Sequence, residues 1–299
     1  MSILVVGSVA FDNIRTPLGK HRDVLGGSAT YFSLSASFFS PVNLVAVVGS
    51  DFPDKYLKLF KDKGIDLEGL VIAEGNTFRW EGEYGWDFNN AKTISTCLNV
   101  FATFNPRIPK EYKNSKYLFL ANIDPQIQEA VLHQVFRPKL IACDTMNHWI
   151  TSKREHLLKF LKKVDLFFLN DAEARQLSGE NNLLKAAKAI FRFGPKRVIV
   201  KKGEHGALFF SPNSIFCVPA FLLEEVVDPT GAGDTFAGGV MGYLAKAGKI
   251  DEESLRKALV YASVMATFAV EDFGPWKLAS IVRADINRRF KEFRKITYF

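Results

Sequence analysis

A glycine-rich stretch, DPTGAGD at residues 228–234, places a carboxylate beside flexible backbone and leads into a run of small residues. A glycine-rich turn before a helix exposes unpaired N–H groups at the positive end of the helix dipole, where an anion can bind. The N–H groups of Gly231, Ala232 and Gly233 would then stabilise charge that develops on a phosphate. A carboxylate at Asp234 would repel a bound phosphate, but it could accept the proton of a hydroxyl that attacks a phosphoryl group. The stretch therefore indicates phosphoryl transfer.

The same residues also have a purely structural interpretation. Asp234 could be the N-cap of the following helix, with the glycines present only for close packing. Two other phosphate motifs are excluded. The chain contains no G-x-x-x-x-G-K-[ST] sequence, and the glycines at 231 and 233 lack the third glycine of a dinucleotide fingerprint.

Apolar runs that end in turns alternate with helical patterns along most of the chain. Strands are expected at residues 3–6, 44–48, 117–120, 140–143, 166–169 and 198–200. Helices are expected at residues 27–39, 54–63, 125–136, 152–164 and 183–193, and the tail from residue 231 is expected to be helical in three segments. Near-continuous apolar strands between helices predict an α/β fold, a doubly wound, mostly parallel sheet with helices on both faces.

Residues 66–105 interrupt this rhythm. They combine aromatic and β-branched residues with glycines and an Asn-Asn turn, which is typical of antiparallel hairpins. A second hairpin is expected at residues 207–210 and 215–218. The aromatic residues of the first hairpins could stack on a ligand, form the hairpin core or contact another subunit; they are Trp80, Tyr84, Trp86 and Phe88, with Arg79 alongside.

Charge and cysteine content narrow the class of protein. A net charge of +7 would favour nucleic acid only if it were concentrated, but Lys and Arg recur along the whole chain. The densest basic run, residues 283–295, alternates with apolar residues, so we expect a solvated helix face and no nucleic-acid partner. Cys97, Cys143 and Cys217 form neither a disulfide framework nor a zinc spacing, and we expect Cys143 and Cys217 to be buried.

The N-terminal apolar run is short and lacks a basic leader. No apolar stretch of the sequence reaches the length that crosses a bilayer. We therefore expect a cytoplasmic protein with no membrane partner.

The stretch DPTGAGDTFAGG, residues 228–239, resembles the C-terminal signature of the ribokinase-like (PfkB) family of carbohydrate and nucleoside kinases. The other motifs discussed below occur in the same order as in this family over nearly the whole chain. The resemblance implies a ribokinase-like domain over residues 1–299, with a small β lid formed mainly by residues of about 10–30 and 66–105. It also implies ATP and Mg²⁺ as cofactors, Asp234 as the catalytic base and residues 231–233 as the anion hole.

The resemblance extends to residues that would hold the acceptor. Asp12 matches the family aspartate that hydrogen-bonds substrate hydroxyls, although a turn-capping role is the alternative. Gly26, Gly27 and Ser28 resemble the di-glycine hinge between lid and core, where glycine allows the backbone to bend and to approach a ligand. A plain tight turn is the alternative there.

Further matches fall on the nucleotide side. Asn170 and Glu173 resemble the family N-x-x-E motif, whose Glu acts near the magnesium and phosphate groups, directly or through water; they would also make a helix-capping pair, and both interpretations can hold together. Lys201, Gly203 and Gly206 resemble the nucleotide loop, and a hairpin turn is the alternative.

A monovalent cation such as K⁺ is left open by the resemblance. Asp228, Thr230 and residues 270–274 fall where many relatives hold one. One departure concerns the acceptor. The family usually has an Asn shortly after the di-glycine, whereas this chain has Tyr31, so a phenol replaces an amide. This puts ribose or fructose in doubt as the substrate.

The sequence thus predicts a phosphotransferase that uses ATP to phosphorylate a hydroxyl of a small sugar, polyol or nucleoside. A non-catalytic sugar or nucleotide sensor on the same fold is the first alternative, and a basic nucleic-acid binder is a remote one. By the family resemblance, two lids would pair in a homodimer.

Overall fold

The computed structural model describes residues 1–89 and 91–297. A nine-stranded sheet has the order β13-β12-β11-β10-β9-β8-β1-β4-β5. Its strands are β1 (Ile3–Val6), β4 (Val42–Gly49), β5 (Ile65–Ala73), β8 (Tyr117–Leu120), β9 (Leu140–Cys143), β10 (Leu166–Asn170), β11 (Arg197–Lys201), β12 (Ala207–Ser211) and β13 (Ser214–Val218). Pairing is parallel from β11 to β5, and β12 and β13 add an antiparallel hairpin at one edge.

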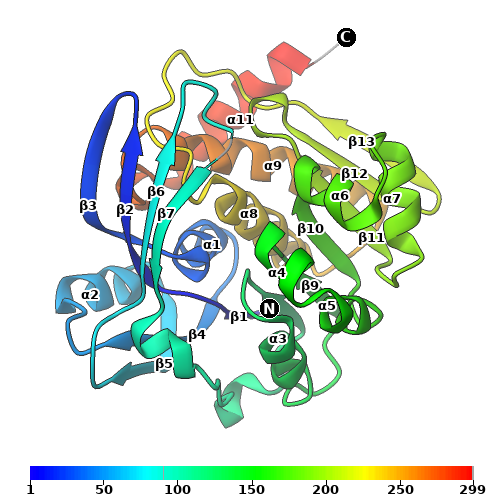
Figure 1. Ribbon diagram of the computed structural model, residues 1–299. Helices are drawn as coiled ribbons and strands as arrows, with labels where there is room; N and C mark the ends of the chain where they lie inside the picture. The colour runs from blue at the N-terminus through cyan, green and yellow to red at the C-terminus, as the bar shows by residue number, and fades with distance from the viewer. Residues whose placement is uncertain (90, 298–299) are drawn as a thin grey trace.

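Helices cover both faces of this sheet, as the sequence predicts (Figure 1). One face carries α1 (Ser28–Ser37), α2 (Asp54–Asp62), α8 (Ala232–Ala247), α9 (Glu252–Val270), α10 (Trp276–Ser280) and α11 (Arg283–Thr297). The other carries α3 (Pro125–Leu132), α4 (Asn147–Ser152), α5 (Arg154–Leu161), α6 (Asp171–Ser178) and α7 (Leu183–Phe191). Alternate residues of β1 divide between the two cores: Ile3 and Val5 pack in the first, Leu4 and Val6 in the second.

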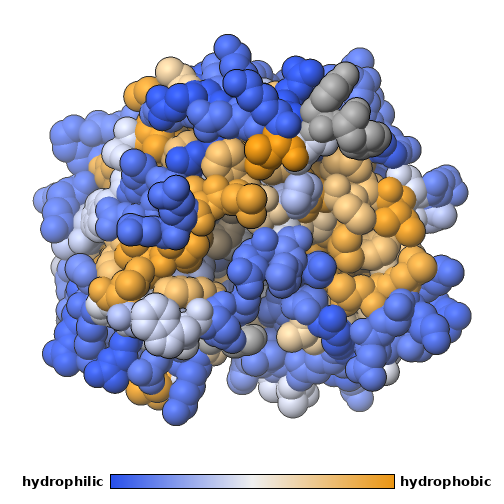
Figure 2. Space-filling view, turned by 90° about the horizontal axis from the view of Figure 1, so that it is seen from above, coloured by the Kyte–Doolittle hydropathy of each residue, from blue (hydrophilic) through white to orange (hydrophobic). Residues whose placement is uncertain are grey.

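A second, four-stranded sheet has the order β3-β2-β6-β7. Its strands are β2 (Ala10–Thr16), β3 (Gly19–Gly26), β6 (Arg79–Tyr84) and β7 (Ala91–Cys97). β2 pairs antiparallel with β3 and parallel with β6, and β6 and β7 form the predicted hairpin. Figure 2 looks down on the top of the molecule, where hydrophobic residues are flanked by hydrophilic ones.

Several boundaries differ from the sequence predictions. β5 belongs to the large sheet, so the antiparallel pairing expected over residues 66–105 is limited to β6 and β7. β5 is an edge strand with one open side, and its mixed apolar and polar pattern looks like that of a hairpin strand. The helix expected at residues 152–164 is observed as the shorter α5, while α4 just before it and α6 before α7 were not among the expected helices.

The C-terminal tail contains four helices within the described residues, α8 to α11, where three were expected. Ile281 is extended and separates α10 from α11. Cys143 is buried as predicted, but Cys217 is exposed because it lies on the outermost strand, β13. In the described chain, no helix is both long and apolar enough to cross a membrane.

Short 3-10 helices lie in connections, at Asn99–Thr103, Lys110–Tyr112 and Gly203–His205. The last of these joins β11 to β12 at the same sheet edge as the residues considered below. This C-terminal edge of a parallel sheet is where doubly wound folds hold their ligands.

Candidate active site

The first turn of α8 holds the carboxylate and the glycines that the sequence singles out. Gly231, with a left-handed φ of 75°, is the N-cap of the helix, and Asp234 is the third helical residue. The alternative in which Asp234 is the N-cap is therefore wrong. The Ala232 N–H donates to the Pro229 carbonyl over 3.2 Å. Among the described residues, the N–H groups of Gly231 and Gly233 are thus left without a backbone acceptor.

A lysine lies directly against this turn. Lys201 ends β11, and its Nζ is 2.6 Å from an oxygen of Asp144, which follows β9. Both side chains are largely buried. A Cβ atom built on Gly233 would lie 3.0 Å from the Lys201 Nζ. The missing side chain at Gly233 therefore lets the ammonium group approach the turn that would bind an anion.

Three carboxylates, those of Asp144, Glu173 and Asp234, interact electrostatically with Lys201. Burial raises the pKa of Asp234 to about 7; the negative charge of Asp144 adds to the rise and Lys201 opposes it. Burial also raises the pKa of Glu173 to about 7, against the attraction of Lys201. Burial alone would lower the pKa of Lys201, but Asp144, Glu173 and Asp234 hold it above its ordinary value. Asp234 can therefore exchange a proton near neutral pH, as a general base must.

Asn170 and Glu173 form a capping box at the start of α6. The Glu173 N–H donates to Asn170 Oδ1 and the Asn170 N–H donates to Glu173 Oε2, each over 2.7 Å. The capping interpretation is confirmed. It leaves Oε1 of the buried Glu173 available in the same electrostatic neighbourhood as Lys201, Asp144 and Asp234.

Gly203 and Gly206 lie in the turn that joins the antiparallel strands β11 and β12, so the hairpin interpretation is also confirmed. Both have positive φ, 54° and 79°. The Lys202 N–H donates to the Gly206 carbonyl over 2.8 Å, which closes the turn immediately after Lys201. The turn thus lies at the sheet edge beside the lysine.

Asp12 lies in β2 of the small sheet and interacts electrostatically with Asp234. Burial raises its pKa to about 8; the charges of Asp228 and Asp234 add to the rise and a hydrogen bond from the Gly27 backbone opposes it. A Cβ atom on Gly26 would lie 1.9 Å from an Asp12 oxygen. Gly26 is therefore required because the Asp12 carboxylate fills the space that a side chain would need.

Gly27 and Ser28 connect the small sheet to α1. Gly27 has a φ of 91°, and a Cβ atom there would lie 2.5 Å from the Ser8 carbonyl oxygen. The Ser28 hydroxyl lies 3.1 Å from that of Ser8, and the Ser28 N–H donates to the same Ser8 hydroxyl. The Ser28 hydroxyl, predicted to bind substrate, is thus already engaged with the first strand's loop.

The buried Asp228 joins two loops. Its carboxylate accepts hydrogen bonds from the N–H of Thr230 over 2.9 Å and from the N–H of Gly274 over 3.1 Å. Burial raises the pKa of Asp228, and these hydrogen bonds oppose the rise. The Val227 N–H donates to the Val270 carbonyl over 2.8 Å. The loop at 270–274 is thereby fixed beside the segment that leads into the glycine turn.

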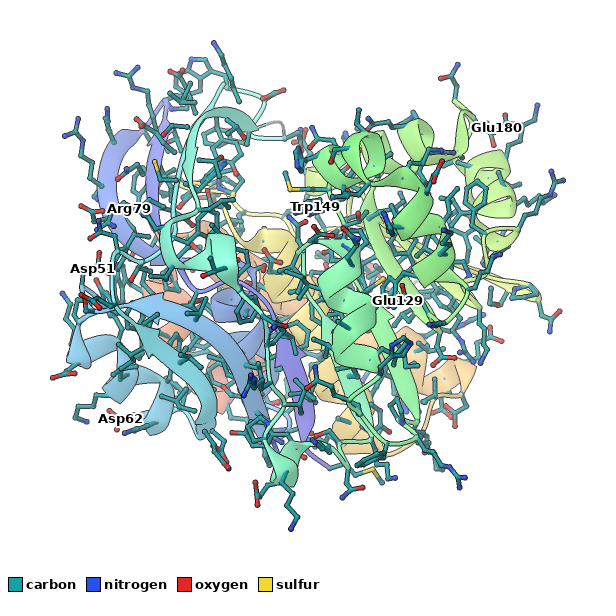
Figure 3. All side chains as sticks on the ribbon, turned by 60° about the horizontal axis from the view of Figure 1, so that its bottom comes forward. Asp51, Asp62, Arg79, Glu129, Trp149 and Glu180 are labelled. Atoms are coloured by element: carbon teal, nitrogen blue, oxygen red, sulfur yellow. The ribbon has the colours of Figure 1, made fainter. Side chains whose placement is uncertain are left out.

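The small sheet contacts the core at both ends of β6. The Thr230 hydroxyl donates to Tyr84 Oη over 3.2 Å. Arg79 Nη2 lies 2.9 Å from an Asp51 oxygen and its Nε 3.0 Å from Asp23, and Figure 3 shows Arg79 and Asp51 side by side. Trp86, in contrast, is 77% exposed and lies outside this contact.

Sequence reasoning did not single out Asp144, and it left Tyr31 without a role. Asp144 belongs to no spaced motif, but it directly follows a central parallel strand, which is a usable signal. A Cβ atom on Gly231 would lie 2.3 Å from atoms of the Tyr31 ring, so this ring packs against the backbone of the glycine turn. That contact joins residues 200 positions apart and has no local signature.

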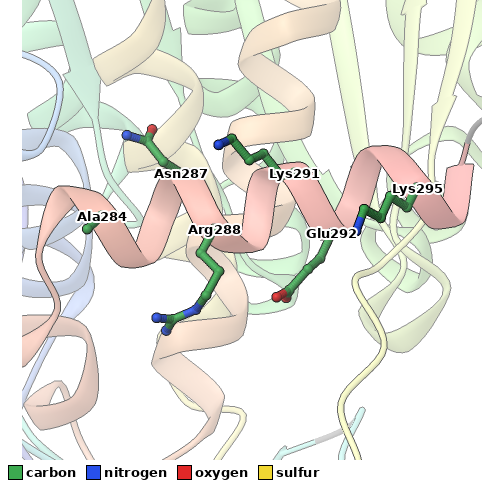
Figure 4. Close-up of a pocket in the computed structure, with 6 residues that line it drawn as sticks. All are labelled: Ala284, Asn287, Arg288, Lys291, Glu292 and Lys295. Atoms are coloured by element: carbon green, nitrogen blue, oxygen red, sulfur yellow. The ribbon is translucent and has the colours of Figure 1, made fainter.

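The basic run near the C-terminus is the amphipathic helix that the sequence predicts. A shallow surface on α11 is lined by Ala284, Asn287, Arg288, Lys291, Glu292 and Lys295 (Figure 4). All six are exposed, while Ile286 and Phe293 of the same helix are buried. The charges therefore lie on a solvated face, on a different element from the cluster around Asp234.

Known proteins resemble the chain over its whole length. The sequence model of the pfkB family of carbohydrate kinases matches residues 2–277. A cytidine kinase from Thermococcus kodakarensis is 28% identical over 93% of this chain and 99% of its own. A nucleoside kinase from Methanothermobacter thermautotrophicus is 26% identical over 91% of this chain and 90% of its own.

Solved structures share the fold. A nucleoside kinase from Methanocaldococcus jannaschii, described as an archaeal member of the ribokinase family, superposes with a TM-score of 0.77 at 20% identity, covering 97% of this chain and 98% of its own. An E. coli protein described as a putative ribokinase II in complex with ATP and Mg²⁺ has a TM-score of 0.78 at 21% identity, covering 97% and 99%. With the family model matched across nearly the entire sequence, the chain belongs to the pfkB family of carbohydrate kinases and is a phosphotransferase that acts on an alcohol group.

Proposed function

We propose that this protein is an ATP-dependent kinase that transfers the γ-phosphoryl group to a hydroxyl of a small sugar, polyol or nucleoside, with a nucleoside as the favoured acceptor. The preference for a nucleoside is supported by two relatives over about nine-tenths of the chain, which are named cytidine kinase and nucleoside kinase. The observation that carries the catalytic proposal is Asp234, a carboxylate with a pKa of about 7 in the first turn of a helix, beside a glycine turn and Lys201.

In the proposed reaction, Asp234 takes the proton of the acceptor hydroxyl while the hydroxyl oxygen attacks the γ-phosphorus. The bond between that phosphorus and the bridging oxygen breaks, and ADP leaves. The N–H groups of the glycine turn and the Lys201 ammonium, which lies against Gly233, would stabilise the charge on the transferring group. Asp144 would hold Lys201 in place through the 2.6 Å ion pair.

A bound Mg²⁺ would offset the excess negative charge of the carboxylates near Lys201. Three carboxylates, Asp144, Glu173 and Asp234, act on the charge of Lys201, so carboxylate charge exceeds that of this lysine before a nucleotide adds its phosphates. Within the described residues no cluster of acidic, His or Cys side chains could hold a metal by itself. The nucleotide phosphates would therefore supply ligands, as is usual for Mg²⁺, with Glu173 on the metal side, directly or through water. Bound there, Mg²⁺ would neutralise phosphate charge.

We assign the nucleotide to the edge formed by Asn170, Lys201, Gly203 and Gly206. The support is that these residues lie at or just after the carboxyl ends of β10 and β11. Both glycines have positive φ, a conformation that favours glycine, so no side chain there would block a bound nucleotide. For a monovalent cation such as K⁺, Asp228 and Thr230 are the proposed location, since the buried Asp228 carboxylate accepts hydrogen bonds from the neutral N–H groups of Thr230 and Gly274, which leave its negative charge to be offset.

On the acceptor side, the proposed ligands are Asp12 and the backbone at Gly26, Gly27 and Ser28. The small sheet would act as the lid of a single kinase domain over residues 1–299. A homodimer through this lid is supported by β7, all of whose residues are exposed, and by the exposed Trp86. A cytoplasmic location is supported by the three free cysteines.

A panel of acceptors tests the function. ADP formation from ATP should be measured with cytidine, inosine, ribose, 2-deoxyribose and myo-inositol, with and without Mg²⁺. We expect Mg²⁺-dependent ADP formation with at least one nucleoside, and a phosphorylated product by mass spectrometry. Tight binding of nucleotide and acceptor without any product would instead favour the non-catalytic sensor.

A further inference from the structure

The hydroxyl of Tyr31 is a polar group that the protein itself leaves unsatisfied. Tyr31 is the fourth residue of α1 and is 1% exposed. Its hydroxyl oxygen is buried and has no hydrogen-bond partner among the described residues. A buried polar group without a partner costs about 1–3 kcal/mol, so its presence calls for an explanation.

The surroundings of this hydroxyl are those of the acceptor side of the site. Burial raises the pKa of Tyr31 well above its ordinary value; the charges of Asp228 and Asp12, then Tyr84 and Asp234, add to the rise. The phenol therefore stays protonated and remains a hydrogen-bond donor. The ring itself is fixed, because it packs against the backbone of Gly231, as described above.

A second phenol shares these neighbours. The pKa of Tyr84 is raised, first by burial and then by Asp228, Asp12 and Asp234. Tyr84 accepts a hydrogen bond from Thr230, which leaves its own O–H hydrogen available as a donor. Two neutral donors, one from α1 and one from the lid strand β6, thus lie among the carboxylates of the acceptor side.

An unsatisfied phenol alone would not be informative, because Tyr117 also has a buried hydroxyl without a partner in the described residues. Tyr117 is the first residue of β8 and lies at the amino ends of the parallel strands, whereas Asp144 and Lys201 lie at their carboxyl ends. Burial is the one cause that raises the pKa of Tyr117, and no carboxylate contributes. Tyr31 differs because its ring packs against Gly231 of the turn that carries Asp234, and because the charges of Asp228, Asp12 and Asp234 all act on its hydroxyl.

We propose that the Tyr31 hydroxyl donates a hydrogen bond to a non-reacting hydroxyl of the acceptor, and that Asp12 accepts one from the same hydroxyl or its neighbour. The acceptor class is then a compound with neighbouring hydroxyls beside the reacting one, such as a ribonucleoside, and its deoxy analogues are poor substrates. A site that is built to bond a substrate hydroxyl rejects the analogue that lacks it, because its own polar group stays buried and unpaired. This inference rests on the proposed kinase function.

The test compares Tyr31→Phe with the wild type on cytidine, 2′-deoxycytidine and 3′-deoxycytidine. For the wild type, we expect kcat/KM to fall at least about 10-fold when the bonded hydroxyl is removed. In Tyr31→Phe, kcat/KM for cytidine should fall about 10-fold while that for the poor deoxy analogue changes little, so the preference is lost. The KM for ATP should stay unchanged.

Tyr117→Phe is the matched control, because it removes the other unsatisfied phenol far from the site and should leave all these values unchanged. The melting temperature of Tyr31→Phe should be equal to or above that of the wild type, since no protein hydrogen bond is lost. A merely structural Tyr31 would lower kcat/KM for all three nucleosides alike, and that result overturns the inference. A change confined to the K⁺ dependence or to the KM for ATP also overturns it.

Failure of the proposed function looks different. If the wild type phosphorylates none of the three nucleosides, the nucleoside preference fails, and the same comparison is made by calorimetric binding and turnover of ribose and 2-deoxyribose. If the wild type binds and phosphorylates none of these compounds, both the proposed function and this inference are refuted. Turnover of cytidine with an unaltered preference in Tyr31→Phe refutes the inference alone.

Discussion

The two sides of the Asp234 carboxylate are built from different chemistry. On the side of β9 to β11, the Lys201 ammonium forms an ion pair with Asp144 and lies close to the glycine turn. On the side of β2 and α1, the donors are the neutral phenols of Tyr31 and Tyr84, among carboxylates. A cation beside flexible backbone suits phosphate groups, whereas neutral donors and carboxylates suit hydroxyl groups.

This contrast supports the proposal that Asp234 acts as a single base between a nucleotide and an acceptor. Asp234 lies where the two sides meet, and its pKa of about 7 reflects burial first and then the opposing charges of Asp144 and Lys201. The positive charge of Lys201 favours the ionised carboxylate, while burial and Asp144 raise its pKa toward the range that the proposed base needs to take a proton from an alcohol. The comparison therefore predicts that substitutions on one side alter the kinetics of one ligand and spare the other.

The largest effect on turnover should come from substitution of Asp234, which lies between the two sides. Asp234→Asn should lower kcat by about 10² to 10⁴, because the amide is nearly isosteric with the carboxylate but cannot take the proton. Nucleotide binding, measured by calorimetry, should be retained. Asp251→Asn, in the first-turn region of α9, is the matched control, since Asn also caps a helix. A variant that keeps most of its turnover would show that Asp234 is not the base.

Lys201→Met should come next and should affect the nucleotide side alone. Loss of the ammonium beside the glycine turn should lower kcat by an amount on the order of 10² and raise the KM for ATP, with the deoxy-analogue preference intact. Because this change leaves Asp144 buried and unpaired, folding must be checked by thermal denaturation, and Lys201→Arg should recover part of the activity.

The control for the lysine is Lys196→Met, which removes an exposed lysine paired with Asp165. It should leave the kinetics unchanged. An equal loss of acceptor preference in Lys201→Met would break the division between the two sides, because the lysine would then act on both ligands.

A smaller effect is expected from Glu173→Gln. Gln at this position can still complete the capping box with Asn170, so the helix should be preserved. The Mg²⁺ concentration for half-maximal rate should rise by about 10-fold, with the acceptor KM unchanged. Glu180→Gln, at the outer edge of the molecule in Figure 3, is the control. An unaltered Mg²⁺ curve would restrict Glu173 to its capping role.

Much of the phosphoryl-transfer side could be predicted from the sequence, because its parts are local. The glycine turn, the helix that follows and the capping pair of Asn170 and Glu173 are contained in short stretches with their own physical signatures. The same holds for the central strands, whose apolar runs are buried on both faces. Edge strand β5 was wrongly assigned because its pattern reflects one open side.

The acceptor side was harder to predict, since it depends on contacts between distant segments. Tyr31 meets Gly231 across 200 residues, and Tyr84 of the small sheet contacts Thr230 in the turn before α8. Asp144 was missed for a related reason, because its partner Lys201 is 57 residues away. Sequence patterns report periodicity and local turns, and they do not report which side chains converge after the chain folds.

The pH dependence of turnover, compared between the wild type and Asp234→Asn, tests the central claim most directly. Asp234 must be ionised to act as the base, and its raised pKa of about 7 means that its ionised fraction falls as the pH drops below that value. For the wild type, we predict that kcat rises with pH up to about 7 and then levels off, whereas the residual activity of Asp234→Asn lacks this acidic limb. A wild-type rate that is flat from about pH 5.5 to 8.5, or an acidic limb that persists in Asp234→Asn, would contradict the assignment of Asp234 as the base.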